Sequence, residues 1–73
     1  MTFGEMLLKL MKEKGISQAE LARRSGMSKQ SITELVKGRS KEPTFSKAKA
    51  LADALGVTLE EMAGMVFEDE NLS

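Results

Sequence analysis

Residues 17–38, SQAELARRSGMSKQSITELVKG, restrict the fold of this 73-residue chain more than any other segment does. A serine, which is a favoured residue at the N-terminus of a helix, begins each half of the segment. A glycine, which can adopt the left-handed conformation that ends a helix, follows each half. The segment therefore predicts helices at 17–25 and 28–37, joined by a turn of about three residues around Gly26.

Similar start signals divide the rest of the chain. Three pairs have the spacing of a capping box, in which a hydroxyl and a carboxylate each accept from a backbone N–H: Thr2 with Glu5, Ser17 with Glu20, and Thr58 with Glu61. Thr44 can also cap a helix, and Pro43 blocks helix formation just before it. These signals predict five helices, at residues 2–14, 17–25, 28–37, 44–55 and 58–64, and no strand.

Apolar residues recur at helical spacing within these segments, which predicts an all-α domain with a single small core. The expected inward-facing residues are Phe3, Leu7, Leu10, Leu21, Ala22, Ile32, Leu35, Val36, Phe45, Ala48, Leu51, Ala52 and Leu55. Four further residues are expected to close the ends of this core: Ile16, Val57, Leu59 and Met62.

Composition excludes several kinds of functional site. The sequence contains no Cys and no His, so disulfides, cysteine zinc sites and the commonest general base are excluded. It has no phosphate-binding loop of the G-x-x-x-x-G-K-[ST] type. Glu60 and Glu61 point to different faces of a helix, so they do not form a two-carboxylate site. We therefore expect neither an enzyme nor a bound metal or cofactor.

The sequence gives no sign of a membrane segment. No apolar run approaches the roughly 20 residues that a transmembrane helix needs. The first residues lack the basic region, apolar run and cleavage site of a signal peptide. We therefore expect a cytoplasmic protein.

Charge is distributed unevenly along the chain, although the net charge is zero. Residues 1–57 contain all 11 Lys and Arg but six of the 11 acidic residues, which gives +5. Residues 58–73 contain the other five acidic residues, which gives −5. A basic body favours a polyanionic partner on one face, and ordinary solvated charge is the alternative interpretation.

Two short helices that cross tightly can present one exposed face to the major groove of DNA. Four segments, in this order, carry a family resemblance: KGISQAELARRSGMS, QSI, KG followed by KEPTF, and ALADALGVTLEEM. From about Leu7 to Met62 the chain resembles the DNA-binding domain of the lambdoid phage repressors and Cro proteins, the Cro/repressor-type helix-turn-helix family. The resemblance implies a five-helix bundle whose third helix enters the major groove of double-stranded DNA.

The resemblance places Lys29, Gln30 and Thr33 against base edges. Their chemistry suits this role, because Lys can reach guanine acceptors, Gln can bond adenine twice, and the Thr methyl group can touch thymine. Helical spacing puts these residues opposite Ile32 and Leu35, so they would be exposed with or without DNA.

The resemblance also implies contacts to the DNA backbone. Gln18, in the first turn of the second helix, would donate to a phosphate and orient a side chain of the third helix; a solvated residue is the alternative. Ser28 and Ser31 could bond phosphate or cap the third helix, and capping is the favoured role for Ser28. A basic loop would approach the phosphates, or else be merely solvated: Lys37, Arg39, Ser40 and Lys41.

Three departures from the family pattern affect these expectations. Many members have a partly buried Arg–Glu ion pair at the positions of Met11 and Val36. Hydrophobic residues can replace such a pair at little cost, so we expect these two side chains to touch. Lys37 replaces a usual Asn and adds a charge near the DNA backbone. Thr44 stands where some phage repressors have an Arg that reaches toward the minor groove, and Thr44 is too short to do so.

The end of the chain has more apolar residues than a small core requires: Met62, Met65, Val66 and Phe67. In the phage repressors this region forms the dimer contact, so a homodimer would place two third helices about 34 Å apart. Alternatively, these residues complete the core or adjoin a further domain. We expect a DNA-binding domain at residues 1–67 and an acidic disordered tail at 68–73.

The sequence thus favours a sequence-specific transcriptional regulator, and in particular a repressor of a palindromic operator. The competing interpretation is a protein-interaction module, because toxin-binding antitoxins and accessory proteins use the same helical bundle. An acidic end with exposed methionines would suit a protein partner. Whether the chain is a fragment of a longer regulator is left open by the sequence.

Overall fold

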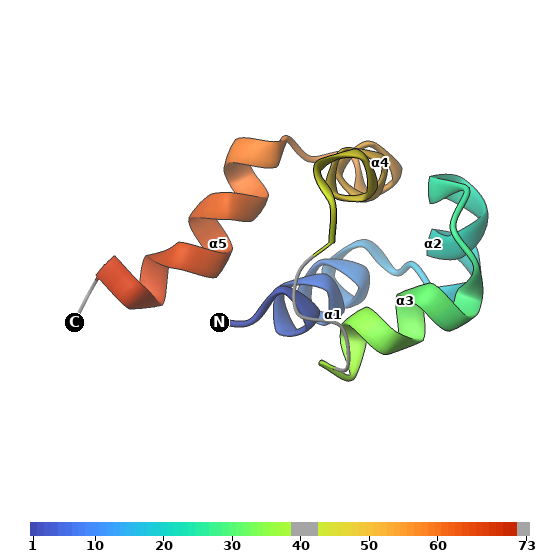
Figure 1. Ribbon diagram of the computed structural model, residues 1–73, viewed down its shortest axis with the longest axis horizontal. Coiled ribbons are helices and arrows are strands. Elements are labelled where there is room, and N and C mark those ends of the chain that lie inside the picture. The colour runs from blue at the N-terminus through green and yellow to red at the C-terminus, as the bar shows by residue number, and fades with distance from the viewer. Residues whose placement is uncertain (39–42, 72–73) are drawn as a thin grey trace.

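The computed structural model describes residues 1–38 and 43–71, with side chains described as far as Phe67. Five helices make up this part of the chain: α1 (Phe3–Lys14), α2 (Gln18–Ser25), α3 (Lys29–Val36), α4 (Phe45–Leu55) and α5 (Leu59–Asn71). No strand occurs in the described residues, and the predicted all-α fold is confirmed. Figure 1 shows α2 and α3 at one end of the molecule and α5 at the other.

Hydroxyl caps fix the starts of the helices as the sequence predicts. At α1 the capping box is complete, since the Glu5 N–H donates to Thr2 Oγ1 at 3.1 Å and the Thr2 N–H donates to Glu5 Oε1 at 2.8 Å. At α2 only half of the box forms: Ser17 Oγ accepts from the Glu20 N–H at 3.1 Å, but the Glu20 carboxylate pairs with the two arginines of α2. The remaining helices are capped by Ser28, Thr44 and Thr58.

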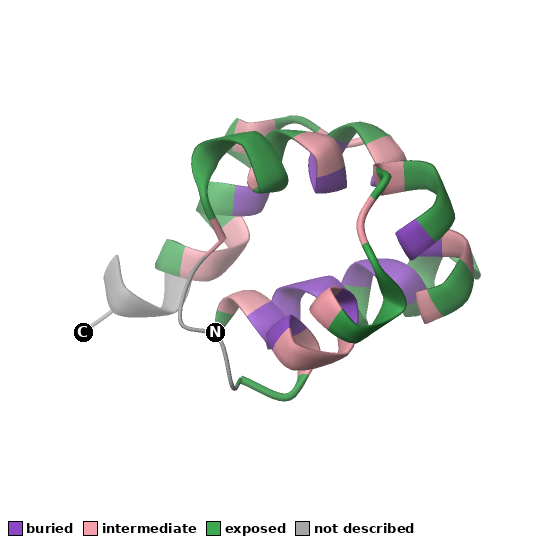
Figure 2. Ribbon diagram, turned by 45° about the vertical axis from the view of Figure 1, so that its right-hand side comes forward, coloured by how far each residue is buried: buried purple, intermediate pink, exposed green. Residues whose placement is uncertain are grey.

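The core lies where the helices meet, and its buried side chains are all apolar. It consists of Met6, Leu7, Leu10, Met11, Leu21, Ala22, Ile32, Leu35, Leu51, Ala52, Leu55 and Met62. Figure 2 shows the buried residues on the sides of the helices that face one another. Burying one large aliphatic side chain contributes about 1.5–3 kcal/mol, so this cluster is what holds the short helices together.

Periodicity identified most of this core but misplaced one aromatic residue. Phe45 is 75% exposed, although Leu51, Ala52 and Leu55 of the same helix are buried. Phe45 is the first residue of α4. Periodicity gives the side of the helix on which a residue lies, but not whether a neighbouring element covers that end of the helix. Several other predicted members are half-buried against the cluster: Phe3, Ile16, Val36, Val57 and Leu59.

α5 is longer than the helix predicted at residues 58–64, because it continues to Asn71. Gly64 lies inside this helix and does not end it. The helix therefore includes part of the segment assigned to an acidic tail. The division of the chain at residue 67 into a domain and a disordered tail stays a prediction.

Tertiary contacts explain how α5 continues past its predicted end. Met62 is buried, and Met65 and Val66 pack against the core cluster. The N-terminal ammonium of Met1 also donates to the Val66 carbonyl oxygen at 3.3 Å. Such packing commonly overrides the weak local preferences on which a sequence-based helix boundary depends.

Candidate nucleic-acid interface

The turn between α2 and α3 is as short and tight as the sequence predicts. α2 ends at Ser25, and Gly26 follows with a positive φ of 74°. A Cβ at Gly26 would meet no atom within 4 Å, so backbone conformation, and not space, favours glycine here. The Met27 N–H donates to the Ala22 carbonyl oxygen at 3.1 Å, and α3 begins at Lys29.

α3 is seated against the bundle by its buried side. Ile32 and Leu35 of α3 are buried, and so are Leu21 and Ala22 of α2. The opposite side of α3 is consequently free to face solvent or a partner.

α1 contacts the end of α3 through a glycine that sequence reasoning did not identify. A Cβ at Gly4 would lie 2.4 Å from the Leu35 carbonyl oxygen and 2.7 Å from that of Val36. Side-chain atoms cannot approach a backbone oxygen so closely, so Gly4 helps to set the position of α3. The available signal was a glycine inside a helix, which costs helix stability unless packing requires it.

The three predicted base-contacting residues lie on the outer side of α3. Lys29 and Gln30 are exposed, and Thr33 is half-buried. The Gln30 Nε2 atom donates to Glu34 Oε1 at 3.5 Å, which is the long end of the hydrogen-bond range. Glu34 was not among the predicted site residues, although its spacing of four residues from Gln30 was a signal for such a pair.

One hydrogen bond joins α2 to α3 on this outer side. Thr33 Oγ1 donates to Oε1 of Gln18, the first residue of α2, at 2.9 Å. Because the Gln18 amide oxygen accepts this bond, its amide nitrogen is left to donate outward. Gln18 thus bonds a side chain of the third helix, and its contact with a phosphate stays a prediction.

The other predicted backbone-contacting residues lie around the ends of α3. Ser28 Oγ accepts from the Ser31 N–H at 3.1 Å and donates to Ser31 Oγ at 2.9 Å, which is the capping role favoured for it. Lys37 is exposed at the C-terminal end of the helix. Arg39, Ser40 and Lys41 lie outside the described residues.

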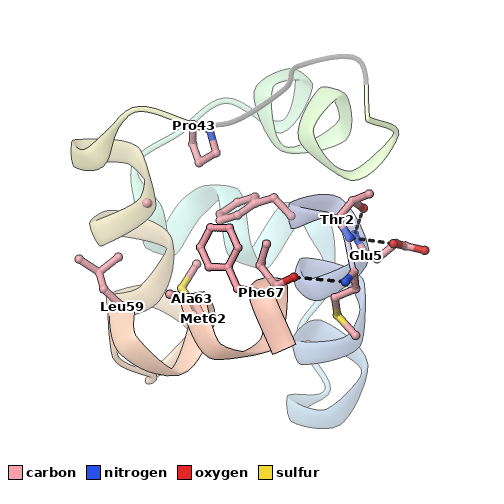
Figure 3. Close-up of a pocket in the computed structure, with 11 residues that line it drawn as sticks. Thr2, Glu5, Pro43, Leu59, Met62, Ala63 and Phe67 are labelled. Carbon is pink, nitrogen blue, oxygen red and sulfur yellow. Dashed lines mark hydrogen bonds between the residues drawn. The ribbon is translucent and has the colours of Figure 1, made fainter. Parts of the chain in front are cut away.

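The predicted dimer-contact residues divide between the core and the surface. Met62 is 2% exposed and completes the core, which is the alternative that the sequence left open. Met65 and Val66 are half-buried, and Phe67 is 48% exposed. Phe67 and Val66 line a cavity of about 560 Å³ between the start of α1, Pro43 and α5. Figure 3 shows the side chains around this cavity. Most of the side chains that line it are apolar.

Met11 and Val36, which replace an expected ion pair, both belong to the apolar interior. Met11 is 5% exposed, and Val36 is half-buried against the core cluster. Direct contact between the two side chains stays a prediction.

The described part of the chain offers no site for a metal ion made by three or more acidic residues. No helix in residues 1–38 and 43–71 is long and apolar enough to cross a membrane. Within the described residues, Gln18 and Thr33 are polar side chains from two different helices, α2 and α3, that the fold brings into a hydrogen bond.

Comparison with known proteins identifies the family. The model of the helix-turn-helix family matches residues 7–62. The chain is also 42% identical over 55 residues to an uncharacterized HTH-type transcriptional regulator, y4dJ of Sinorhizobium fredii (strain NBRC 101917 / NGR234), in an alignment that covers 75% of this chain and 70% of that protein. The chain belongs to the Cro/C1-type helix-turn-helix family, whose members are DNA-binding regulators rather than enzymes.

Proposed function

We propose that this protein binds double-stranded DNA in a sequence-specific way, with α3 in the major groove, and represses transcription from a palindromic operator. The observation that carries the proposal is the outer side of α3. Lys29, Gln30 and Thr33 share that side, and Thr33 is bonded to Gln18 at the start of α2. A short helix anchored in this way presents its side chains to base edges, as helix-turn-helix units do.

Each of these side chains offers a different group to DNA. The Lys29 ammonium can donate to guanine N7 and O6, and the Gln30 amide can bond adenine N6 and N7. The Thr33 hydroxyl is engaged by Gln18, so its methyl group is the part offered outward, and it suits the thymine methyl group. Residues 30 and 33 lie one turn apart and would contact neighbouring base pairs.

The DNA backbone would lie against the ends of α2 and α3. Gln18 can donate an amide N–H to a phosphate at the N-terminus of α2, where the helix dipole also favours an anion. The exposed Lys37 supplies a cation at the other end of α3. The remaining proposed phosphate contacts are Ser28, Ser31, Arg39, Ser40 and Lys41. The charge of +5 on residues 1–57 favours such binding.

A homodimer would give the two α3 helices the spacing of a palindrome. The proposed contact residues of α5 are the exposed Phe67, the half-buried Met65 and Val66, and Met62, which lies in the core. The two α3 helices would then lie one DNA turn apart, about 34 Å. We propose that the protein acts in the cytoplasm and needs no cofactor.

A second candidate function uses the same apolar surface for a protein partner, as in an antitoxin. Phe67 is 48% exposed beside a cavity whose lining is mostly apolar. This surface lies at the end of the molecule away from α2 and α3 (Figure 1). A variant with Lys29 and Gln30 changed to Ala separates the two functions, because it removes base contacts and leaves the α5 surface unchanged.

Selection from a library of random DNA duplexes at near-physiological salt tests the proposal. We expect enrichment of a palindrome whose half-sites are centred about ten base pairs apart. A salt titration on the enriched duplex then separates phosphate contacts from base contacts. Weak binding that is sensitive to salt and enriches no sequence would contradict a sequence-specific regulator.

A further inference from the structure

Glu34 is an acidic residue on the helix that carries the proposed base contacts. It lies four residues after Gln30, is half-buried, and accepts from Gln30 Nε2 through Oε1 at 3.5 Å. A carboxylate here repels DNA phosphates, so it weakens binding to DNA of any sequence. Glu34 on α3 therefore does not increase the affinity for DNA, and any role that it has in DNA binding is a different one.

Glu34 has one bonded partner in the described part of the chain, and that partner is Gln30. Lys47 of α4 lines the same cavity of about 120 Å³ between α3 and α4. No ion pair joins Lys47 to Glu34 in residues 1–38 and 43–67. Within the described residues, the carboxylate is thus bonded to the amide on its own helix and not to the neighbouring cation.

The chemistry of this pair fixes which way the Gln30 amide points. An ionised carboxylate can only accept hydrogen bonds, whereas an amide group has an accepting oxygen and a donating nitrogen. The Gln30 nitrogen must therefore turn toward Glu34. Gln30 Oε1 is left as the atom that meets a base, with the second N–H of Nε2 beside it.

An accepting oxygen distinguishes the four bases in the major groove. Adenine offers the N6 amino group and cytosine offers the N4 amino group, and both can donate to Gln30 Oε1. Guanine offers two acceptors, N7 and O6, and thymine offers O4 and a methyl group. A Gln30 amide held by Glu34 therefore favours a base with an amino group and disfavours guanine.

We propose that Glu34 is a positioning residue that makes Gln30 read an amino-bearing base, adenine or cytosine, and reject guanine. This inference rests on the proposed DNA-binding function and names a determinant of its specificity. Without the carboxylate, the Gln30 amide can turn over, and its nitrogen can then donate to guanine as readily as its oxygen accepts from adenine. Loss of Glu34 should thus relax specificity at one base pair of each half-site.

The experiment compares base preferences of the full chain and of Glu34→Gln, each selected on the same random duplex library. Glutamine has the same shape but can donate or accept, so it no longer fixes the Gln30 amide. We expect the wild type to prefer an amino-bearing base over guanine by roughly tenfold at the Gln30 position. In Glu34→Gln this preference should fall to within about twofold, and the base preferences at the other positions of the site should not change.

A double-mutant cycle shows whether Glu34 acts through Gln30. In a Gln30→Ala background, Glu34→Gln should no longer alter the base preference at that position. If the change in preference persists without Gln30, Glu34 touches the base itself and the positioning role is wrong. The thermal unfolding temperature of every variant should stay close to that of the wild type. This measurement separates a change in base preference from a loss of structure.

A matched variant controls for the change in charge. Glu13→Gln removes the same charge from an exposed position on α1 and should leave every base preference as it is. If Glu34→Gln keeps the wild-type preference at an enriched site, this inference alone fails. If the wild type enriches no site at all, the proposed function fails, and the inference fails with it.

Discussion

Gln18 and Thr33 are the residues through which the two helices of the proposed interface are joined side chain to side chain in the described structure. Gln18 is proposed to bind a phosphate, and Thr33 is proposed to touch a base. Their hydrogen bond therefore couples the contact that positions the protein on the DNA backbone to the contact that reads the base sequence. Sequence reasoning could find both, because a first-turn amide and an outward-facing residue are local features. It could not find the hydrogen bond between them, which joins residues 15 positions apart in the sequence.

Gln18→Ala and Lys37→Ala should weaken DNA binding in different ways. Gln18 supplies a hydrogen bond to a charged group, worth about 1.5 kcal/mol or roughly tenfold in affinity for all sequences. Lys37 supplies a cation, so its loss should lower the slope of log affinity against log salt by about one unit. Salt titrations of both variants measure this difference. A reduced slope for Gln18→Ala, or an unchanged slope for Lys37→Ala, would show that these roles are assigned wrongly.

Met11→Arg should destabilise the fold by about 3–5 kcal/mol, because it leaves an unpaired charge in the position of a buried methionine. Adding Val36→Glu should recover at least about 1 kcal/mol beyond additivity if the two side chains touch. Urea unfolding of the wild type, both single variants and the double variant measures the coupling. Purely additive effects would refute the predicted contact.

At the scale of elements, local sequence signals correctly predicted where helices start and turn. The sequence did not predict which parts of different helices pack against one another. The hydroxyl caps and the Gly26 turn follow from one or two neighbouring residues, and they form as predicted. The exposure of Phe45 and the continuation of α5 to Asn71 depend on what packs against a helix end. The contact of Gly4 with α3 also required the three-dimensional arrangement. Glu34 is a different case, because it lies four residues from Gln30 on the same helix, and this local spacing was a signal that was not used.

Gly4→Ala should destabilise the protein by about 1–3 kcal/mol, because the new methyl group meets the backbone oxygens at the end of α3. Gly64→Ala is the matched control inside α5. Its Cβ would meet nothing within 4 Å, so higher helix propensity should stabilise the protein by about 0.5–1 kcal/mol. Chemical unfolding of the two variants should shift in opposite directions. A neutral or stabilising Gly4→Ala would contradict the close approach of α1 to α3.

At the scale of the whole molecule, the two proposed surfaces lie at opposite ends. α2 and α3 carry the proposed DNA contacts at one end, and α5 carries the exposed Phe67 at the other (Figure 1). The first surface belongs to the part of the chain with a charge of +5, and residues 58–73 carry −5. DNA binding and self-association should therefore be separable by mutation.

Phe67→Ser should weaken self-association by about tenfold or more, as truncation of a large interface side chain commonly does. Leu8→Ser, on the outer side of α1, is the control, because Leu8 is 46% exposed but lies outside the proposed contact. Sedimentation equilibrium over a range of concentrations measures both. Two results would contradict the proposed dimer surface: equal effects of the two substitutions on self-association, or a wild-type protein that stays monomeric on its DNA site.

The central claim, that the outer side of α3 reads DNA, is tested most directly by the ratio of specific to non-specific affinity in a Lys29→Ala, Gln30→Ala double variant. The measurement uses the enriched duplex and a scrambled duplex at one salt concentration, with Lys9→Ala on α1 as a control for charge. We predict that the ratio falls toward one in the double variant, with thermal unfolding preserved, and stays near the wild-type value in Lys9→Ala. A double variant that keeps the wild-type ratio would contradict the assignment of α3 as the helix that reads DNA.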